Sequence, residues 1–202
     1  RVAPADLPIR ETQALRPDSP YGVSKVTQDM LGLQYFLSRG LPVIRVRPFN
    51  HIGPRQTRRF VAPAFASQIA AIEVGKQPPV MKVGNLSASR DFTDVRDVVR
   101  AYVLALEHGE PGEVYNIGTG NIRKLADLLE ILRALATTSF EVRVVPARLR
   151  PVDQTRLLTS YAKLQRETGW APSYTIEQTL GDLLDEARIL VRSRDHAGAQ
   201  DP

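Results

Sequence analysis

The stretch YGVSKVTQDMLGLQYFLSRGLPVIRVRPFNHIGP, residues 21–54, decides the fold class. Its first part carries apolar residues at helical spacing and stops at a glycine, which predicts one long helix over residues 21–38. A β-branched run over residues 42–46 then leads to an Arg-Pro pair, which predicts a buried strand feeding a loop at its carboxyl end. A helix followed by such a strand indicates α/β architecture.

Further helices and strands alternate downstream of this stretch. Apolar periodicity predicts helices over residues 60–74, 95–106, 124–136, around Leu164 and over 176–191, and β-branched runs predict strands over 80–83, 113–117 and 141–145. Asp94 is placed to cap the second of these helices, and Thr175 opens the last one with a capping-box pattern. Because strands are too few for a complete doubly wound sheet, we expect the C-terminal portion of a Rossmann-type fold plus a small mixed α/β domain.

The composition narrows the class of protein. The 202 residues are 43% hydrophobic, contain no cysteine and have three scattered histidines, so we expect a folded chain without disulfides or a metal site. No apolar run approaches the roughly 20 residues that cross a bilayer, and no signal peptide opens the chain, so we expect a cytoplasmic protein without a membrane partner. The net charge of +5 comes from dispersed basic residues, which suits a small polyanionic ligand, and we expect no nucleic-acid partner.

Tyr21 and Lys25 stand four residues apart at the start of the long predicted helix. This spacing places a phenol and an ammonium on the same side of the helix, one turn from each other. The positive charge favours the phenolate, which would let Tyr21 pass a proton to or from a sugar oxygen near neutral pH. Taken alone, the pair favours the alternative of two ordinary helix residues, and the catalytic interpretation depends on the rest of the sequence.

The segment Arg47-Pro48-Phe49-Asn50-His51 follows the predicted strand, at the place where open α/β sheets bind their ligands. Asn50 offers amide donors and acceptors, and the surrounding loop offers backbone N–H groups. The alternative is a connector in which Asn50 makes its own turn, and His51 by itself reads as structural.

Two other loops carry arginines of interest. Arg90 precedes a strongly amphipathic helix, where its guanidinium can donate two hydrogen bonds to a phosphate. Arg150 and Asp153 share a proline-containing loop, where arginine suits phosphate and aspartate suits ribose hydroxyls. For each loop the alternative is a salt bridge at the surface.

Five motifs occur in one order along the chain: Tyr-x-x-x-Lys, Arg-Pro-Phe-Asn-His, Arg-Asp-Phe-x-x-Val-x-Asp, Val-Tyr-Asn-Ile-Gly and Arg-x-x-Asp. Taken together, they resemble the nucleotide-sugar epimerase, dehydratase and reductase branch of the extended short-chain dehydrogenases. The resemblance covers residues 1 to about 190. The resemblance implies Tyr21 as catalytic acid/base and Lys25 as its electrostatic partner. It implies a cofactor, NADP or NAD, that contacts Tyr21, Lys25, Pro48, Asn50 and His51. The residues that it implies for the substrate nucleotide are Asn50, Arg90, Arg150 and Asp153.

Within this branch, the segment Arg47–Pro54 is most similar to enzymes that act on GDP-mannose derivatives. The resemblance implies NAD(P)H-dependent reduction of GDP-4-keto-6-deoxy-mannose to a GDP-6-deoxyhexose of the GDP-rhamnose type. The alternatives are a GDP-mannose 4,6-dehydratase or related epimerase, and a module that binds a nucleotide without turnover. Because the family's glycine-rich phosphate loop does not occur in these residues, we expect the chain alone to be inactive.

The resemblance also implies how the chain is organised. Residues 1–58 would belong to the NAD(P)-binding Rossmann domain, and residues 59–193 mainly to the substrate domain, with residues 90–118 returning to the Rossmann part. Residues 194–202 would form a flexible tail. The family further implies a homodimer through the Tyr21–Ser38 helix, with apolar surface exposed on residues 26–37 of the isolated chain.

Overall fold

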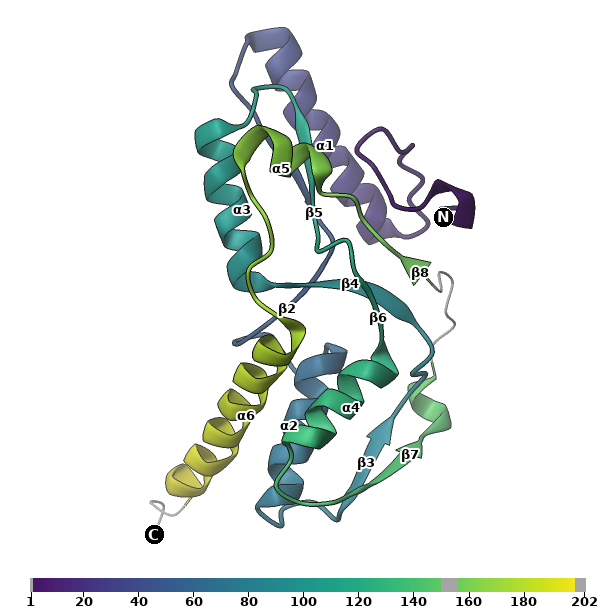
Figure 1. Ribbon diagram of the computed structural model, residues 1–202, viewed down its shortest axis with the longest axis vertical. Helices are drawn as coiled ribbons and strands as arrows, with labels where there is room; N and C mark the ends of the chain where they lie inside the picture. Colours follow the sequence, from purple (N-terminus) through teal and green to yellow (C-terminus); the bar gives the residue numbers. More distant parts are fainter. Residues whose placement is uncertain (1, 150–155, 199–202) are drawn as a thin grey trace. The chain divides into compact units, whose positions relative to one another are not determined.

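The computed structural model describes residues 2–149 and 156–198 and divides the chain into two compact units. Unit 1 comprises Arg1–His51, Arg90–Ile122 and Asp153–Ser173, and unit 2 comprises Ile52–Ser89, Arg123–Val152 and Tyr174–Pro202. Each unit contains a pair of parallel strands with helices packed on it (Figure 1). The predicted α/β class is therefore confirmed. Among the described residues, no helix is long and apolar enough to cross a membrane.

Unit 1 is built on the parallel pair β1–β5. Its helices and strands are η1 (Pro4–Asp6), α1 (Pro20–Arg39), β1 (Arg45–Pro48), most of β4 (Ser89–Asp94), α3 (Val95–His108), β5 (Val114–Ile117), β8 (Arg156–Leu157) and α5 (Ala162–Thr168). Arg45 of β1 is in register with Val114, and Pro48 with Ile117. A further sheet has the strand order β2 (Asn50–Ile52), β4, β6 (Ile122–Lys124), with β8 also pairing β4.

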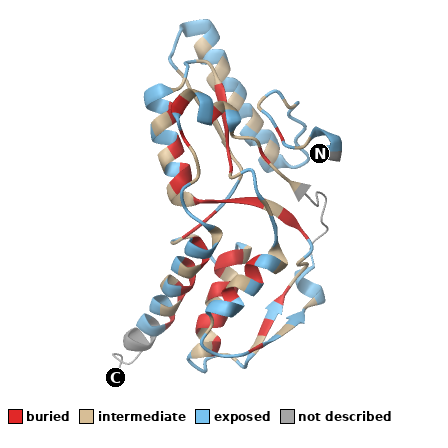
Figure 2. Cartoon of the chain, in the orientation of Figure 1, coloured by how far each residue is buried: buried red, intermediate tan, exposed pale blue. Residues whose placement is uncertain are grey.

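The core of unit 1 lies on one face of β1 and β5. It is made by buried side chains of α3, β5, α5 and the segment after α5, namely Val98, Ala101, Ala105, Tyr115, Ile117, Leu164 and Trp170. Ile44 and Val46 pack against this cluster from β1 and the residue before it. Helix α1 contacts β1 as well, yet none of its side chains is fully buried, and Figure 2 shows it without buried positions.

Unit 2 packs three helices together beside a second parallel pair. Its helices and strands are α2 (Val61–Glu73), β3 (Val80–Val83), α4 (Leu125–Leu135), β7 (Glu141–Val144), η2 (Pro146–Arg148) and α6 (Ile176–Gly198). Helices α2, α4 and α6 contact one another, and β3 contacts α2. Their facing side chains, including Phe65, Leu128 and Leu184, are buried and form the core of this unit.

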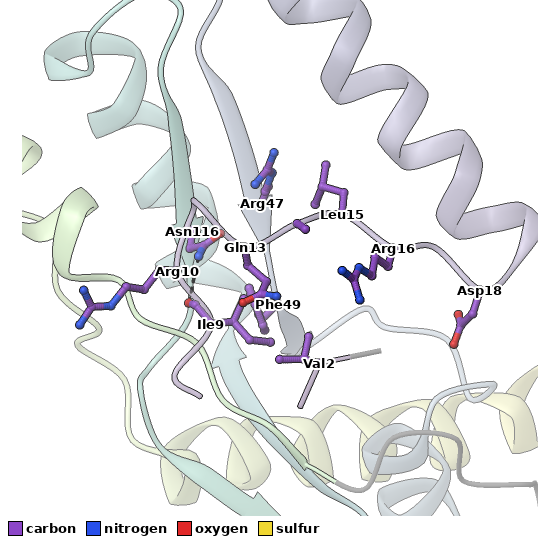
Figure 3. Close-up of a pocket in the computed structure, with 11 residues that line it drawn as sticks. Val2, Ile9, Arg10, Gln13, Leu15, Arg16, Asp18, Arg47, Phe49 and Asn116 are labelled. Carbon is purple, nitrogen blue, oxygen red and sulfur yellow. Dashed lines mark hydrogen bonds between the residues drawn. The ribbon is translucent and has the colours of Figure 1, made fainter. Parts of the chain in front are cut away.

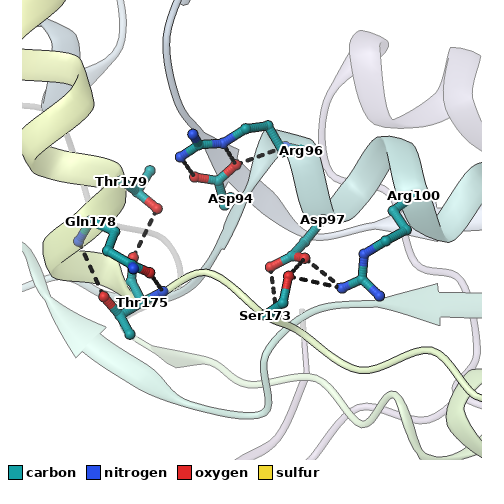
Figure 4. A network of polar contacts seen from close by, with 8 residues as sticks. All are labelled: Asp94, Arg96, Asp97, Arg100, Ser173, Thr175, Gln178 and Thr179. Carbon is teal, nitrogen blue, oxygen red and sulfur yellow. Dashed lines mark hydrogen bonds and ion pairs between the residues drawn. The ribbon is translucent and has the colours of Figure 1, made fainter.

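Local sequence signals explain where several helices begin. The Ser19 hydroxyl accepts a hydrogen bond from Gly22 N at the start of α1, and Asp94 does the same for Arg96 N at the start of α3. At the start of α6, Thr175 Oγ1 accepts from Gln178 N while Thr175 N donates to Gln178 Oε1, which is the predicted capping box (Figure 4). These caps satisfy backbone N–H groups that the first helical turn leaves unpaired.

Two boundaries differ from the sequence prediction by three residues or more. The strand expected at residues 42–46 begins instead at Arg45 and continues to Pro48. Val43 N donates a local hydrogen bond to Leu41 O, and Arg45 N is the first to donate across to the β5 side, to Glu113 O. The last helix, expected to end near residue 191, continues to Gly198 and so includes residues 194–198, which the sequence suggested as part of a tail.

The segment that follows α5 joins unit 1 through a buried carboxylate. Asp97 of α3 accepts hydrogen bonds from Ser173 N, Ser173 Oγ and Arg100 Nη2, as Figure 4 shows for the side chains. Trp170 Nε1 donates to Asp97 O, and the Trp170 side chain is fully buried. These contacts join residues 170–173 to unit 1.

The pair Glu73–Arg188 within unit 2 predicts an acid-sensitive stability. The Arg188 guanidinium donates two hydrogen bonds of 2.8 Å to Glu73 and lowers the pKa of Glu73 from 4.5 to about 2. Because the pKa of Glu73 is lower in the folded state, its ionised carboxylate stabilises the fold by about 3 kcal/mol above pH 4.5. This stabilisation is lost as the pH falls toward 2. We expect Glu73→Gln to lower the free energy of unfolding at neutral pH, and the difference from the wild type to shrink in acid. Urea unfolding across this pH range measures it, and a pH-independent difference would contradict it.

Candidate functional site

Tyr21 and Lys25 lie in the first turns of α1. Tyr21 follows Pro20 at the helix start, and its side chain is 72% exposed. The Lys25 Nζ lies 5.5 Å from the centre of the Tyr21 ring and donates a 3.2 Å hydrogen bond to Gln28 Oε1. The predicted juxtaposition of a phenol and an ammonium is therefore present, with the Tyr21 ring open to a reactant.

The loop after β1 carries the next group of predicted site residues. Pro48 ends β1, Phe49 N donates to Ile117 O, and Asn50 and His51 enter β2 with exposed side chains. The His51 Nδ1 lies 3.2 Å from Phe49 O, so its ring is oriented by the adjacent backbone. These residues stand at the carboxyl end of a parallel strand, where ligands of α/β sheets bind.

Arg90 joins this group through strand pairing. It lies in β4, which is hydrogen-bonded to β2, so Asn50 and Arg90 occupy neighbouring strands. Arg90 is half-buried, and burial lowers the pKa of its guanidinium. Arg150 and Asp153, which the sequence also proposed for the nucleotide, lie outside the described residues.

A cavity of about 320 Å³ opens in unit 1 beside the carboxyl ends of β1 and β5. The segment before α1, β1 and β5 contribute its walls, as Figure 3 shows. Its polar lining consists of Arg10, Gln13, Arg16, Asp18, Arg47 and Asn116. Ile9, Leu15 and Phe49 supply apolar surface. A mixed lining with several guanidinium groups suits a polar, negatively charged ligand.

Residues 3–183 match the sequence profile of the family described as GDP-mannose 4,6 dehydratase. The chain belongs to this family. The match confirms the resemblance to the nucleotide-sugar branch of the extended short-chain dehydrogenases.

Relatives of the chain in this branch include a reductase and dehydratases. GDP-6-deoxy-D-mannose reductase of Pseudomonas aeruginosa is 43% identical over 192 residues, which cover 95% of this chain. A GDP-mannose 4,6-dehydratase of Sordaria araneosa is 30% identical over 208 residues, which cover 94% of this chain. The chain spans 63% of the length of the first relative and 38% of the second.

Solved structures of the branch share the fold. RMD from Pseudomonas aeruginosa, complexed with NADPH, matches with a TM-score of 0.90 at 40% identity, covering 94% of this chain and 63% of its own. The dTDP-glucose 4,6-dehydratase from Bacillus anthracis, in complex with NAD, matches with a TM-score of 0.75 at 30% identity, covering 88% and 54%.

Asp91, which follows Arg90 in β4, has a structural role that the sequence did not reveal. Its buried carboxylate accepts hydrogen bonds from Thr119 N and Oγ1, from Gly120 N and from Thr159 N. Burial raises its pKa, while these hydrogen bonds act in the opposite direction. Three residues further along the chain, the Asp94 carboxylate accepts two hydrogen bonds from the Arg96 guanidinium.

The structure thus gives Asp91 a local structural task. From β4, the strand that also carries Arg90, it holds the turn at Thr119 and Gly120 against Thr159, two residues after β8. Gly118 lies in the same contact, because a Cβ there would collide with the Thr159 side chain. The glycines of Gly118-Thr119-Gly120 are a sequence signal for a turn, but they do not specify which carboxylate the N–H groups of this turn bind.

Removal of the Asp91 carboxylate is expected to destabilise the fold strongly. Asp91→Ala leaves the N–H groups of Thr119, Gly120 and the buried Thr159 without their acceptor, so we expect the free energy of unfolding to fall by about 3 kcal/mol. Glu130→Ala is a matched control, since this exposed side chain makes only a 3.8 Å ion pair with Arg133 and should cost under about 0.5 kcal/mol. Chemical denaturation measures both, and equal losses would refute the role of Asp91.

Proposed function

We propose that the complete protein containing this chain reduces the 4-keto group of a GDP-4-keto-6-deoxy-hexose with NADPH or NADH, yielding a GDP-6-deoxyhexose of the GDP-rhamnose type. The observation that carries the proposal is the exposed Tyr21–Lys25 pair at the start of α1, in a chain 43% identical to GDP-6-deoxy-D-mannose reductase. Family membership and the loop Arg47–His51 support the same substrate class.

The residues of α1 supply the proton chemistry of this reduction. Tyr21 donates its hydroxyl proton to the sugar O4 as the C4–O double bond becomes a single bond. Lys25 stabilises the phenolate that remains, and solvent then returns a proton to Tyr21. When bound, the reduced nicotinamide supplies a hydride for C4 of the sugar and is itself oxidised.

The donor set around Tyr21 fits a nicotinamide nucleotide. The exposed Lys25 ammonium has donors suited to ribose hydroxyls, and Pro48, Asn50 and His51 stand at the carboxyl end of β1. The relatives of known structure include complexes with NADPH and with NAD, which supports NADP or NAD as the cofactor here.

Asn50 and Arg90 are proposed to hold the diphosphate of the GDP-sugar, together with Arg150 and Asp153. The support is that Asn50 and Arg90 lie on neighbouring strands and that an arginine can donate two hydrogen bonds to phosphate. Residues 1–58 and 90–118 would then belong to the dinucleotide-binding domain, and residues 59–193 otherwise to the substrate domain.

Two other proposals retain specific support. A GDP-mannose 4,6-dehydratase activity is favoured by the description of the matched family. A homodimer through α1 is favoured by the exposed apolar side chains on that helix, among them Met30, Leu31, Tyr35 and Leu37.

The role of Tyr21 is tested in the complete natural polypeptide that contains this sequence. Tyr21→Phe should lower kcat for oxidation of NADPH by GDP-4-keto-6-deoxymannose by at least about 100-fold, with KM nearly unchanged, because the hydroxyl acts in the transition state. Tyr35→Phe, a half-exposed tyrosine on the same helix, is the matched control and should retain full turnover.

Steady-state kinetics with absorbance of NADPH measure these effects. Turnover of Tyr21→Phe within about twofold of the wild type would reject Tyr21 as the proton donor. No NADPH oxidation by the wild type, with release of a 4-keto sugar from GDP-mannose, would assign the protein as a dehydratase instead.

A further inference from the structure

Strand β1 has two chemically different faces. Successive side chains of a β-strand lie on opposite faces of the sheet. Parallel strands such as β1, which pairs with β5, usually carry apolar side chains on both faces. Val46 faces the apolar core made by α3, β5 and α5. Arg45 and Arg47, on the other face, are directed at α1. A helix that would ordinarily cover an apolar sheet face therefore meets two guanidinium groups.

Both arginines bind one carboxylate of α1. Arg47 Nη2 donates a short hydrogen bond to Asp29 Oδ2, and Arg45 Nη1 lies 3.6 Å from Asp29 Oδ1. The side chains of Arg45 and Asp29 are each 12% exposed, and that of Arg47 is 20% exposed. The three side chains form a largely desolvated cluster between helix and strand, which we call the Asp29 cluster.

The arginines of the Asp29 cluster are held in turn by backbone oxygens. Arg45 Nη2 donates 3.0 Å to Gly112 O, and Arg47 Nη1 donates 3.0 Å to Glu11 O. Each guanidinium is thus fixed by more than one acceptor, which limits the positions that Asp29 can take. A buried ion pair of this kind adds little net stability compared with an apolar contact, but it restricts the relative position of the helix and the strand that it joins.

Asp29 lies on the side of α1 that carries the proposed catalytic pair. It follows Lys25 by one turn and Tyr21 by two turns, so these side chains project from neighbouring positions on the helix. Gly32, one turn further, allows close approach to β1 and the segment before it, because a Cβ there would lie only 3.2 Å from Val43 Cγ1 and 3.5 Å from Arg45 Cγ. The polar contact of Asp29 thus joins α1 to β1 one turn beyond Lys25.

Apolar packing fixes the rest of α1 less closely. No side chain of this helix is fully buried in the described structure. The Phe36 ring packs on Gly112, but this contact lies near the opposite end of the helix from Tyr21. The hydrogen bond and ion pair of Asp29 with Arg47 and Arg45 are therefore placed to fix the rotation and axial position of the first turns.

We propose that Asp29 is a positioning residue: held by Arg45 and Arg47 of β1, it sets the rotation and axial position of α1 and thereby the place of Tyr21 and Lys25 beside the carboxyl end of that strand. The inference rests on the proposed function in taking Tyr21 as the proton donor. Misplacement of a reacting group by about 1 Å costs on the order of 100-fold in rate, whereas substrate binding by other residues is unaffected.

The test compares two neutralised carboxylates in the complete polypeptide. Asp29→Asn keeps the shape of the side chain and removes its charge, and we expect kcat for the keto-sugar to fall at least about tenfold, with KM changed less than about threefold. Glu73→Gln is the matched control, because it removes an arginine-bound carboxylate of 7% exposure that belongs to unit 2, whereas α1 belongs to unit 1. It should lower stability comparably and leave kcat unchanged.

A second readout follows α1 directly. Amide hydrogen exchange of residues 23–28 should accelerate in Asp29→Asn and remain at the wild-type rate in Glu73→Gln. Both variants are measured at a temperature where circular dichroism shows them folded, so that global unfolding does not contribute.

The positioning role of Asp29 and the proposed function would be contradicted by different results. Unchanged kcat in Asp29→Asn, or an equal loss in Glu73→Gln, would overturn the positioning role. If the wild type itself fails to turn over the keto-sugar, the proposed function is wrong, and the exchange rates then decide the role of Asp29 alone. Unaltered exchange of residues 23–28 in Asp29→Asn would overturn it in that case also.

Discussion

The parallel pairing of β1 with β5 is the constraint on which the candidate site depends. It aligns Pro48 with Ile117, so that both strands end at one edge, and the chain leaves that edge as the loop to Asn50 and His51. The same pairing fixes which side chains of β1 face the core and which face α1. An apolar face with Val46 anchors the strand in unit 1, and a charged face with Arg45 and Arg47 receives the helix that carries Tyr21.

Buried carboxylates organise the polar segments around this pair. Asp97 holds the segment ending at Ser173 against α3, and Asp91 holds the turn after β5. Both are fully buried and receive several hydrogen bonds. Because a buried charge without such donors is costly, each fixes the loops that supply them. Rigid loops beside strand ends suit a site that must orient a charged nucleotide.

Much of the fold and part of the site could be predicted from the sequence. Periodicity located α1, α2, α3 and α6, and Asp94 and Thr175 marked two helix starts, because these signals are local. The Tyr21–Lys25 pair followed from helical spacing in the same way. The partners of Asp29, Asp91 and Asp97 could not be predicted, since each contact joins residues distant in sequence that only the tertiary fold brings together.

The proposed reaction of this member of the GDP-mannose dehydratase family is a net reduction at C4 of the sugar. Dehydration of GDP-mannose to a 4-keto sugar is redox-neutral and consumes no reduced cofactor, so an isotope distinguishes the two reactions. The most direct measurement supplies the complete polypeptide with GDP-4-keto-6-deoxymannose and NADPH deuterated at the transferred position of the nicotinamide, and analyses the product by mass spectrometry and proton NMR. The account predicts one deuterium at C4 of the product hexose; a nucleotide sugar recovered without deuterium while the keto group persists would contradict it.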